Sequence, residues 1–167
     1  MVDDLQELAS AEAAALQLSR TPCDLSALAD TAASRLADSF DAAGVGLVRR
    51  LTRVQVLGDS GRIHEIVTNL LTNALKFTPA LGRVLVEAGL HGQQAMLRVS
   101  DTGVGIPPDE LPHICERFFR GDQASGVAGS GIGLTVVAEL VQAHGGTLDV
   151  TSTPGQGTIF TVTLPRA

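Results

Sequence analysis

The chain has 167 residues, of which 44% are hydrophobic and 3% aromatic, and its formal net charge is −6. This length suits one α/β domain with a short extension, and the core must be aliphatic because Trp and Tyr are absent. The acidic balance argues against binding to nucleic acid or acidic lipid, which needs a basic face. No apolar run approaches the ~18 residues of a membrane span, and the acidic start does not read as a secretory signal. Cys23 and Cys115 have no ligand-like spacing, so we expect reduced thiols in a cytoplasmic protein.

The first third of the chain predicts two helices and then one or two short strands. Residues 1–18 form a polar, alanine-rich helix whose apolar stripe is narrow and needs a packing partner. Thr21-Pro22 should end it, and Asp24 should cap a second helix. The apolar face of that second helix comprises Leu25, Leu28, Ala29, Ala32, Leu36 and Phe40. Residues 45–57 are expected to be extended.

Residues 61–77 predict an amphipathic helix that ends at Thr78-Pro79. Asn69, Asn73 and Lys76 are spaced four and then three apart, so they share one face. Two amides and an ammonium on that face could hold a metal ion and phosphate oxygens. Lys76 is the only lysine among twelve basic residues, and an ammonium acts on phosphate as a point charge. The opposite, apolar side comprises Ile63, Ile66, Val67, Leu70, Leu71, Ala74 and Leu75.

The rest of the chain predicts a sheet with one more long helix. Residues 83–90 and 95–100 should pair as strands, and a short helix should follow Pro107-Pro108. Residues 121–131 are small and glycine-rich and predict a mobile loop. Residues 147–152 and 158–164 should close the chain as a hairpin. Between them, residues 133–144 predict a buried helix, with Leu134, Val137, Ala138 and Val141 facing inward. Helices against a mostly antiparallel sheet predict a two-layer α/β sandwich.

Two glycine-rich segments carry further candidate chemistry. Asp101 stands at a strand end before Gly103 and Gly105, where a carboxylate can accept from an exocyclic amine and a flat ring can approach the backbone. Residues 129–134 open the last helix, where free backbone N–H groups bind phosphate. Taken singly, the first segment could be an ordinary turn and the second a flexible hinge. The second is not a dinucleotide-binding fingerprint, because no parallel strand precedes it.

Five segments in this order resemble the ATP-binding catalytic domain of bacterial sensor histidine kinases, within the gyrase/Hsp90/histidine-kinase/MutL superfamily. The resemblance covers roughly residues 20–165. It implies the Bergerat ATP-binding fold, an α/β (α+β) sandwich in which a mixed, mostly antiparallel sheet packs on about three helices. The matching segments are the N box at 69–78, the G1 box at 101–106, the F box at 116–120, the G2 box at 129–134 and the last glycine-rich turn at 153–160.

The resemblance also implies ATP and Mg²⁺ as cofactors and assigns roles at matching positions. Asn73 would be the direct Mg²⁺ ligand, Asn69 would support it, and Lys76 would touch the phosphates. Asp101 would accept from the adenine amino group, and Thr158 would line the deep side of the pocket. Asn69, Lys76 and Arg120 are the implied catalytic residues. The other implied contacts are Gly103, Gly105 and Ile106 around the ring, Phe118, Phe119 and Arg120 at the lid, and Gly129, Gly131, Gly133 and Leu134 at the phosphates.

The same resemblance implies a phosphoacceptor histidine on a helical hairpin, and the chain has no convincing one. His64 opens a segment that fits the acceptor pattern on paper, but the same residues begin the N box, so we reject it. Structural roles are expected for His91, His113 and His144. The implied partner is therefore a phosphoacceptor dimerisation domain on another chain or domain and, through it, a response regulator.

Residues 1–20 resemble the end of a dimerisation helix, and residues 21–167 would form the ATP-binding domain. The methionine start favours a naturally separate half of a split kinase over an excised piece. Three alternatives stay open: a nucleotide-sensing module without transfer activity, an ATPase of the gyrase or MutL type, and an anti-sigma serine kinase. The ATPases carry a glutamate where Asn69 stands, and the serine kinases lack the segment that contains Phe118 and Phe119.

Overall fold

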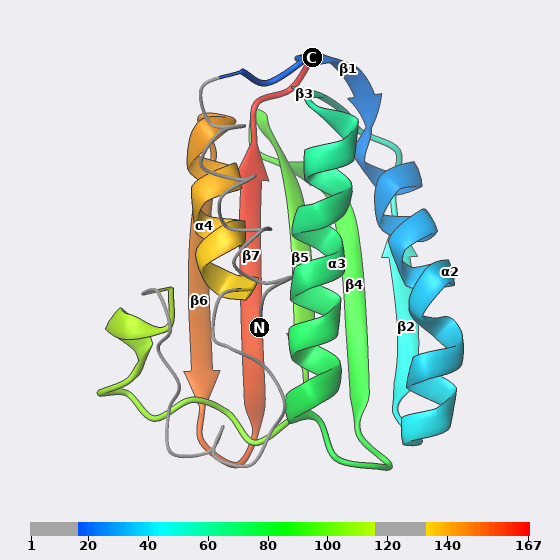
Figure 1. Cartoon of the computed structure of the whole chain (residues 1–167), viewed down its shortest axis with the longest axis vertical. Helices are drawn as coiled ribbons and strands as arrows, with labels where there is room; N and C mark the ends of the chain where they lie inside the picture. The colour runs from blue at the N-terminus through cyan, green and yellow to red at the C-terminus, as the bar shows by residue number, and fades with distance from the viewer. Residues whose placement is uncertain (1–16, 116–132) are drawn as a thin grey trace.

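The computed structural model describes residues 17–115 and 133–167. Three helices lie on one face of a five-stranded sheet and form the predicted two-layer sandwich (Figure 1). These helices are α2 (Leu25–Ala43), α3 (Ser60–Phe77) and α4 (Gly133–Ala143). The predictions for residues 1–16, for the F box and for the whole glycine-rich loop at 121–131 lie outside the described residues. Residues 17 and 18, which were predicted to end the first helix, are not helical. Within the described residues, no helix is long and apolar enough to cross a membrane.

The main sheet has the strand order β2-β4-β5-β7-β6. Its β2–β4 pair is parallel and its other pairs are antiparallel, which confirms the expected mixed, mostly antiparallel sheet. The longest ladder joins the two strands predicted around His91-Gly92. The strands are β2 (Gly46–Leu51), β4 (Arg83–His91), β5 (Gln94–Asp101), β6 (Thr147–Thr153) and β7 (Gly157–Leu164).

A second, two-stranded sheet pairs β1 (Thr21–Asp24) with β3 (Gln55–Gly58). The interpretation of Thr21-Pro22 as a simple break was therefore incomplete. Proline lacks an N–H but is tolerated in an edge strand, and β1 is such a strand. The other side of β3 bridges to Arg166 near the end of the chain, so the pairing that creates β1 is entirely non-local.

Acidic caps begin the two long helices. The Asp24 carboxylate accepts from the backbone N–H groups of Ser26 and Ala27 at 3.0 and 3.3 Å, which satisfies two of the donors that every helix start leaves open. Asp59 caps α3 in the same way by accepting from the Arg62 N–H at 3.3 Å. At the far end of α2, Gly44 adopts a left-handed φ of 72° and ends the helix.

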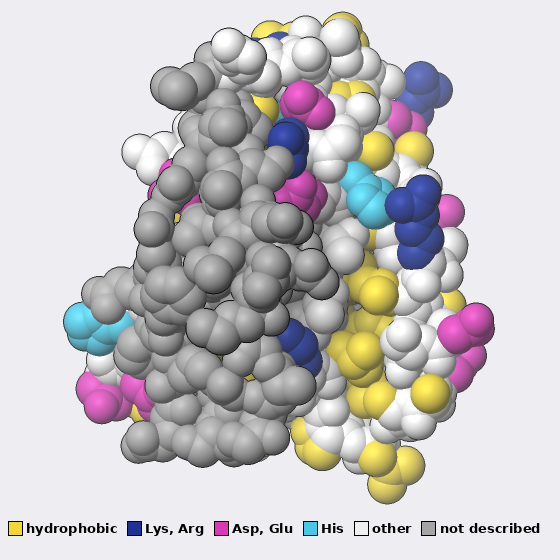
Figure 2. All heavy atoms as spheres, in the orientation of Figure 1, with side chains coloured by type: hydrophobic (Ala, Val, Ile, Leu, Met, Phe, Trp, Pro, Cys, Tyr) yellow, Lys and Arg dark blue, Asp and Glu magenta, His cyan; other side chains and the backbone are white. Residues whose placement is uncertain are grey.

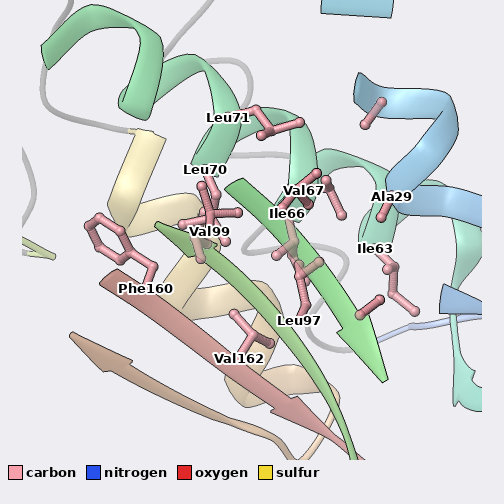
Figure 3. Packing of buried hydrophobic residues seen from close by; sticks show 14 of the residues in the cluster. Ala29, Ile63, Ile66, Val67, Leu70, Leu71, Leu97, Val99, Phe160 and Val162 are labelled. Carbon is pink, nitrogen blue, oxygen red and sulfur yellow. The ribbon is translucent and has the colours of Figure 1, made fainter. Parts of the chain in front are cut away.

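The core lies between the helices and the near face of the sheet. Figure 3 shows apolar side chains of α3, such as Ile66 and Leu70, above Val99 and Phe160 of the strands. The predicted apolar side of α3 is confirmed, because all its members are fully or largely buried. Across the sheet the register aligns rows of inward side chains, one of them formed by Val99, Phe160 and Val150.

Helix α4 differs from its predicted inward face. Leu134 and Ala138 are only half-buried. Almost every position from 134 to 141 is apolar, so periodicity alone cannot choose the inward side. His144, just after the helix, ties its end to the start of α3: its ring is fully buried, Nδ1 lies 2.7 Å from the Leu140 carbonyl, and Nε2 accepts the Asp59 N–H at 3.1 Å. The residues that α4 buries are Thr135, Val136, Val137, Leu140 and Val141.

The segment after Pro107-Pro108 forms only a single 3₁₀ turn, η1 (Leu111–His113), in place of the predicted short helix. Where Figure 2 shows described residues of the helical face, basic and acidic side chains are interspersed.

Candidate nucleotide-binding site

The polar face of α3 carries three of the predicted site residues. Asn69 and Asn73 are half-buried, and Lys76 is exposed in the last turn. Neither amide hydrogen-bonds to another residue in the described part of the chain. A Cβ placed on Gly133 would lie 3.6 Å from Asn69 Oδ1, so the amide face of α3 is next to the first residue of α4. Unpaired amides in such a partly enclosed position are available to a ligand.

These amides suit a magnesium ion that arrives with phosphates. Mg²⁺ prefers oxygen ligands, keeps several waters and is usually bound by one or two side chains together with substrate phosphates. Across residues 17–115 and 133–167, no group of three or more His, Cys, Asp or Glu side chains is arranged to hold a metal. The two amides of Asn69 and Asn73 therefore fit an ion that is bound jointly by the protein and by the phosphates of a nucleotide. They fit less well a metal that the protein alone would hold.

Asp101 ends β5 and is only 9% exposed. Its Oδ1 accepts from the backbone N–H groups of Gly103 and Thr158, at 2.9 and 3.3 Å. Burial raises the pKa of this carboxyl, although both N–H groups favour the charged form. Within the described residues Oδ2 has no hydrogen-bond donor, so it is the oxygen left for a ligand that brings an N–H group.

The loop after Asp101 is clamped from two sides. The Val104 N–H donates to the carbonyl of Phe77 at the end of α3, and the Val104 carbonyl accepts from Gly155 in the β6–β7 turn, at 3.1 and 2.7 Å. A Cβ on Gly103 would lie 2.3 Å from the Phe77 carbonyl oxygen, and Gly105 has a φ of +76°. The glycines that were expected to admit a flat ring thus also permit close backbone packing.

A polar row crosses three strands beside this loop. The register places Asp101 opposite Thr158 and Thr158 opposite Ser152. The Ser152 hydroxyl lies 2.9 Å from Thr158 Oγ1, 3.0 Å from the Gly157 carbonyl and 2.7 Å from the Ile106 nitrogen. Ser152 was not among the predicted site residues, and Gly157 was predicted only as part of the last glycine-rich turn. In the sequence, the only feature that marks these two residues is that they lie close to the last turn. Their contact with the G1 box depends on the register of β5, β6 and β7, which the local sequence does not reveal.

The predicted residues thus form two neighbouring groups. Asp101, Gly103, Gly105, Ile106 and Thr158 lie together at one end of the sheet, and the bond from Val104 to Phe77 joins that group to α3. Gly133 and Leu134 begin α4 beside the amide face. Phe118, Phe119, Arg120, Gly129 and Gly131 lie outside the described residues.

Three helices on a mixed sheet, with a buried aspartate whose second carboxylate oxygen is unpaired at one end and two unpaired amides beside it, are what the ATP-binding domain of the gyrase, Hsp90 and histidine kinase type contains. Residues 58–167 match the family model described as "Histidine kinase-, DNA gyrase B-, and HSP90-like ATPase". The chain belongs to this family.

Several histidine kinases are similar to this chain. It is 35% identical over 172 residues to the circadian input-output histidine kinase CikA of Synechococcus elongatus, a match that covers 99% of this chain and 23% of that one. The mycobacterial sensor histidine kinase MprB superposes with a TM-score of 0.81 at 34% identity, covering 87% of this chain and 98% of that structure. Full-length ShkA, solved in complex with AMPPNP, gives a TM-score of 0.87 at 33% identity over 99% of this chain and 35% of that one.

These comparisons confirm the resemblance to a histidine kinase catalytic domain and the sandwich fold. The chain spans less than half the length of the curated kinases that it matches, for example 36% of BaeS of Escherichia coli.

Proposed function

We propose that this chain is the ATP-binding catalytic part of a two-component sensor kinase, which binds Mg·ATP and delivers the γ-phosphate in trans to a histidine on a separate chain or domain. The observation that carries the proposal is the unpaired Oδ2 of buried Asp101, held beside the amide face of α3. Mg·ATP needs an acceptor for the adenine amine, which Asp101 Oδ2 can provide, and oxygen ligands for its metal ion, which the amides of Asn69 and Asn73 can provide.

We assign the roles from the family resemblance, with which these positions agree. Asp101 accepts from the adenine amino group, Asn73 binds the metal, Asn69 supports it and Lys76 neutralises phosphate charge. Mg²⁺ would supply further neutralisation on the phosphate oxygens. Phosphoryl transfer needs little covalent chemistry from the protein, so these residues act by positioning and electrostatic stabilisation. We assign further nucleotide contacts, on resemblance, to Gly103, Gly105, Ile106, Thr158, Gly133, Leu134, Phe118, Arg120, Gly129 and Gly131.

Transfer in trans is supported by the environment of His64. This residue lies on α3, one turn before Asn69, and its Nε2 is buried without a hydrogen-bonding partner in the described part of the chain. Burial and the nearby Arg35 lower the pKa of the ring. A half-buried imidazole whose Nε2 is enclosed on the nucleotide helix is a poor acceptor for a phosphate bound at the same helix.

The partner follows from this assignment. We propose that residues 1–20 comprise the end of a dimerisation helix and its linker, with the non-helical residues 17–20 in the linker, and that this helix docks on a histidine-bearing hairpin. We further propose that residues 21–167 form the catalytic domain, and that the pair works in the cytoplasm and passes phosphate to a response regulator. The narrow apolar stripe within residues 1–18 needs helices of that kind to pack against.

The ATPase alternative is weaker because, among the described residues of the nucleotide helix, neither Asn69 nor Glu65 is placed as a free general base. Asn69 is an amide without basicity. Glu65, one turn earlier, is held by Arg62 at 3.1 Å. A nucleotide-sensing module has the same binding residues and differs only in lacking transfer, so phosphotransfer must separate the two.

Binding is tested by calorimetric titration with ATP in the presence and absence of Mg²⁺. Asp101→Ala should weaken binding whether or not Mg²⁺ is present, because the adenine amine loses its acceptor. The loss in Asp101→Ala should be on the order of 1–3 kcal/mol, the cost of leaving the amine unpaired in a closed pocket. Asn73→Ala should weaken the Mg²⁺-dependent part of the binding most, because the ion loses its protein ligand. Unchanged affinity in both variants would reject the assignment. Gln142→Ala, an exposed site on α4, is the control.

A further inference from the structure

One hydroxyl connects three parts of the proposed nucleobase pocket. Ser152 lies on β6, outside every segment that carries the family resemblance, and it is half-buried. Its Oγ reaches the Ile106 nitrogen in the G1 loop, the Gly157 carbonyl in the last turn and the Thr158 hydroxyl on β7. No other hydroxyl in the described part of the chain has contacts to all three of these segments.

The proton count of these bonds fixes their direction. A serine hydroxyl has one proton to donate and two lone pairs to accept with. The Ile106 N–H must donate, and the Gly157 carbonyl must accept the single Ser152 proton at 3.0 Å. The bond of 2.9 Å to Thr158 then forms only if Thr158 donates its own proton to Ser152.

This direction decides what Thr158 offers a ligand. With its proton committed to Ser152, Thr158 Oγ1 can act toward the pocket only as an acceptor. The neighbouring Asp101 Oδ2 is also an acceptor, and the same register holds the two residues opposite each other. The side chains at this end of the pocket therefore favour a base that presents N–H groups and disfavour one that presents a carbonyl oxygen.

We propose that Ser152 is a positioning residue for the nucleobase pocket: it holds the Ile106 backbone in place and orients the Thr158 hydroxyl so that the pocket selects an amino-bearing purine. This rests on the proposed ATP binding and adds a residue that sets its selectivity. Ser152 need not touch the nucleotide, because it acts through Ile106 and Thr158.

The test compares Ser152→Val with Ser152→Thr, since valine and threonine have nearly the same shape and only threonine keeps the hydroxyl. Affinities for ATP and for inosine triphosphate, which has a carbonyl where ATP has the amine, are measured by calorimetry. In the valine variant the freed Thr158 proton can turn to the carbonyl. We expect the preference for ATP to fall by about twofold to about tenfold, the range of a net hydrogen bond, and the threonine variant to keep it.

A second readout needs no nucleotide. Amide hydrogen exchange followed by NMR should speed up at Ile106 in Ser152→Val and stay slow in Ser152→Thr, whereas general weakening of the sheet would speed exchange along β5 and β7 together. Thr151→Ala, one residue earlier and on the exposed face, is the control that should change neither readout.

Three outcomes would count against the proposal. Equal ATP preference in the valine and threonine variants, or unchanged exchange at Ile106, would overturn this inference alone while Asp101→Ala still weakens ATP binding. A wild-type chain that binds no ATP would overturn the proposed function and this inference with it.

Discussion

Replacing Asp101 by asparagine should separate the stability of this fold from its proposed function. Asparagine keeps an oxygen that accepts from the Gly103 and Thr158 N–H groups, at the 2.9 and 3.3 Å positions that Oδ1 occupies. It replaces the unpaired Oδ2 with an N–H₂ group, which is a donor facing the donor of the adenine amine. The hydrogen-bonded fold therefore survives, while the acceptor for the base is lost.

The two effects have opposite signs. A hydrogen bond to a charged group is worth about 1.5–3 kcal/mol, so ATP affinity should fall by about 10- to about 100-fold. Apo stability should not fall. Burial raises the folded pKa of Asp101 above its unfolded value, so the folded state favours the neutral carboxyl. The neutral carboxyl therefore stabilises the folded state at low pH, and this stabilisation is lost as pH rises through the folded pKa. Asparagine is neutral at every pH, so the variant does not lose this stabilisation at neutral pH.

Calorimetry with Mg·ATP and thermal unfolding without nucleotide measure the two effects. Asp101→Ala provides the contrast, because it leaves both N–H groups without an acceptor at about 1–3 kcal/mol each and should lower the melting temperature. Asp38→Asn, on the exposed side of α2, controls for the change in net charge. An asparagine variant that melted as low as the alanine variant, or that bound ATP like the wild type, would refute the reasoning.

Three further predictions address the same region and its support. ATP affinity should fall as pH is lowered through the raised pKa of Asp101, because the carboxyl is then protonated. The affinity of Asp101→Asn should not show this fall, and the same pH dependence of ATP affinity in wild type and variant would contradict the prediction. Gly157→Ala should lower the free energy of unfolding in urea by about 2–6 kcal/mol, because its φ is +136° and a Cβ would lie 1.9 Å from the Asp101 carbonyl oxygen. Gly155→Ala is the control: its φ is +81° but no atom lies near the new Cβ, so the free energy of unfolding should fall by only about 1–2 kcal/mol. His144→Leu should cost at least about 1–3 kcal/mol in the same assay, because the Asp59 N–H loses its acceptor; an unchanged midpoint would show that this bond contributes nothing.

Local patterns in the sequence predicted most of the elements. The cap at Asp24, the apolar stripe of α3 and the pair of strands around His91-Gly92 depend on residues a few positions apart, and each is present. The helix α4 was found, but its inward face was only partly predicted: Val137 and Val141 are buried, whereas Leu134 and Ala138 are half-buried. A segment in which most residues are apolar has little periodicity to distinguish its sides.

The remaining differences come from non-local contacts. β1 exists because Pro22 pairs with Leu57, far along the chain, which no local signal announces. Ser152 enters the site only because the register of β5, β7 and β6 brings it next to Thr158 and the G1 loop. The family motifs include Asp101 and Thr158, because a motif is recognised by residue type. Ser152 belongs to no motif, and only the three-dimensional structure shows that it contacts Thr158 and Ile106.

Phosphotransfer tests the central claim most directly. The wild-type chain and radiolabelled ATP are incubated with Mg²⁺, first alone and then with a separate hairpin that carries a phosphoacceptor histidine. The account predicts that the hairpin gains acid-labile phosphate, that this chain gains none, and that Asp101→Ala abolishes the labelling. Acid-labile phosphate on His64 of the isolated chain would contradict transfer in trans, and ATP binding without labelling of any histidine-bearing hairpin would favour a nucleotide-sensing module over a kinase.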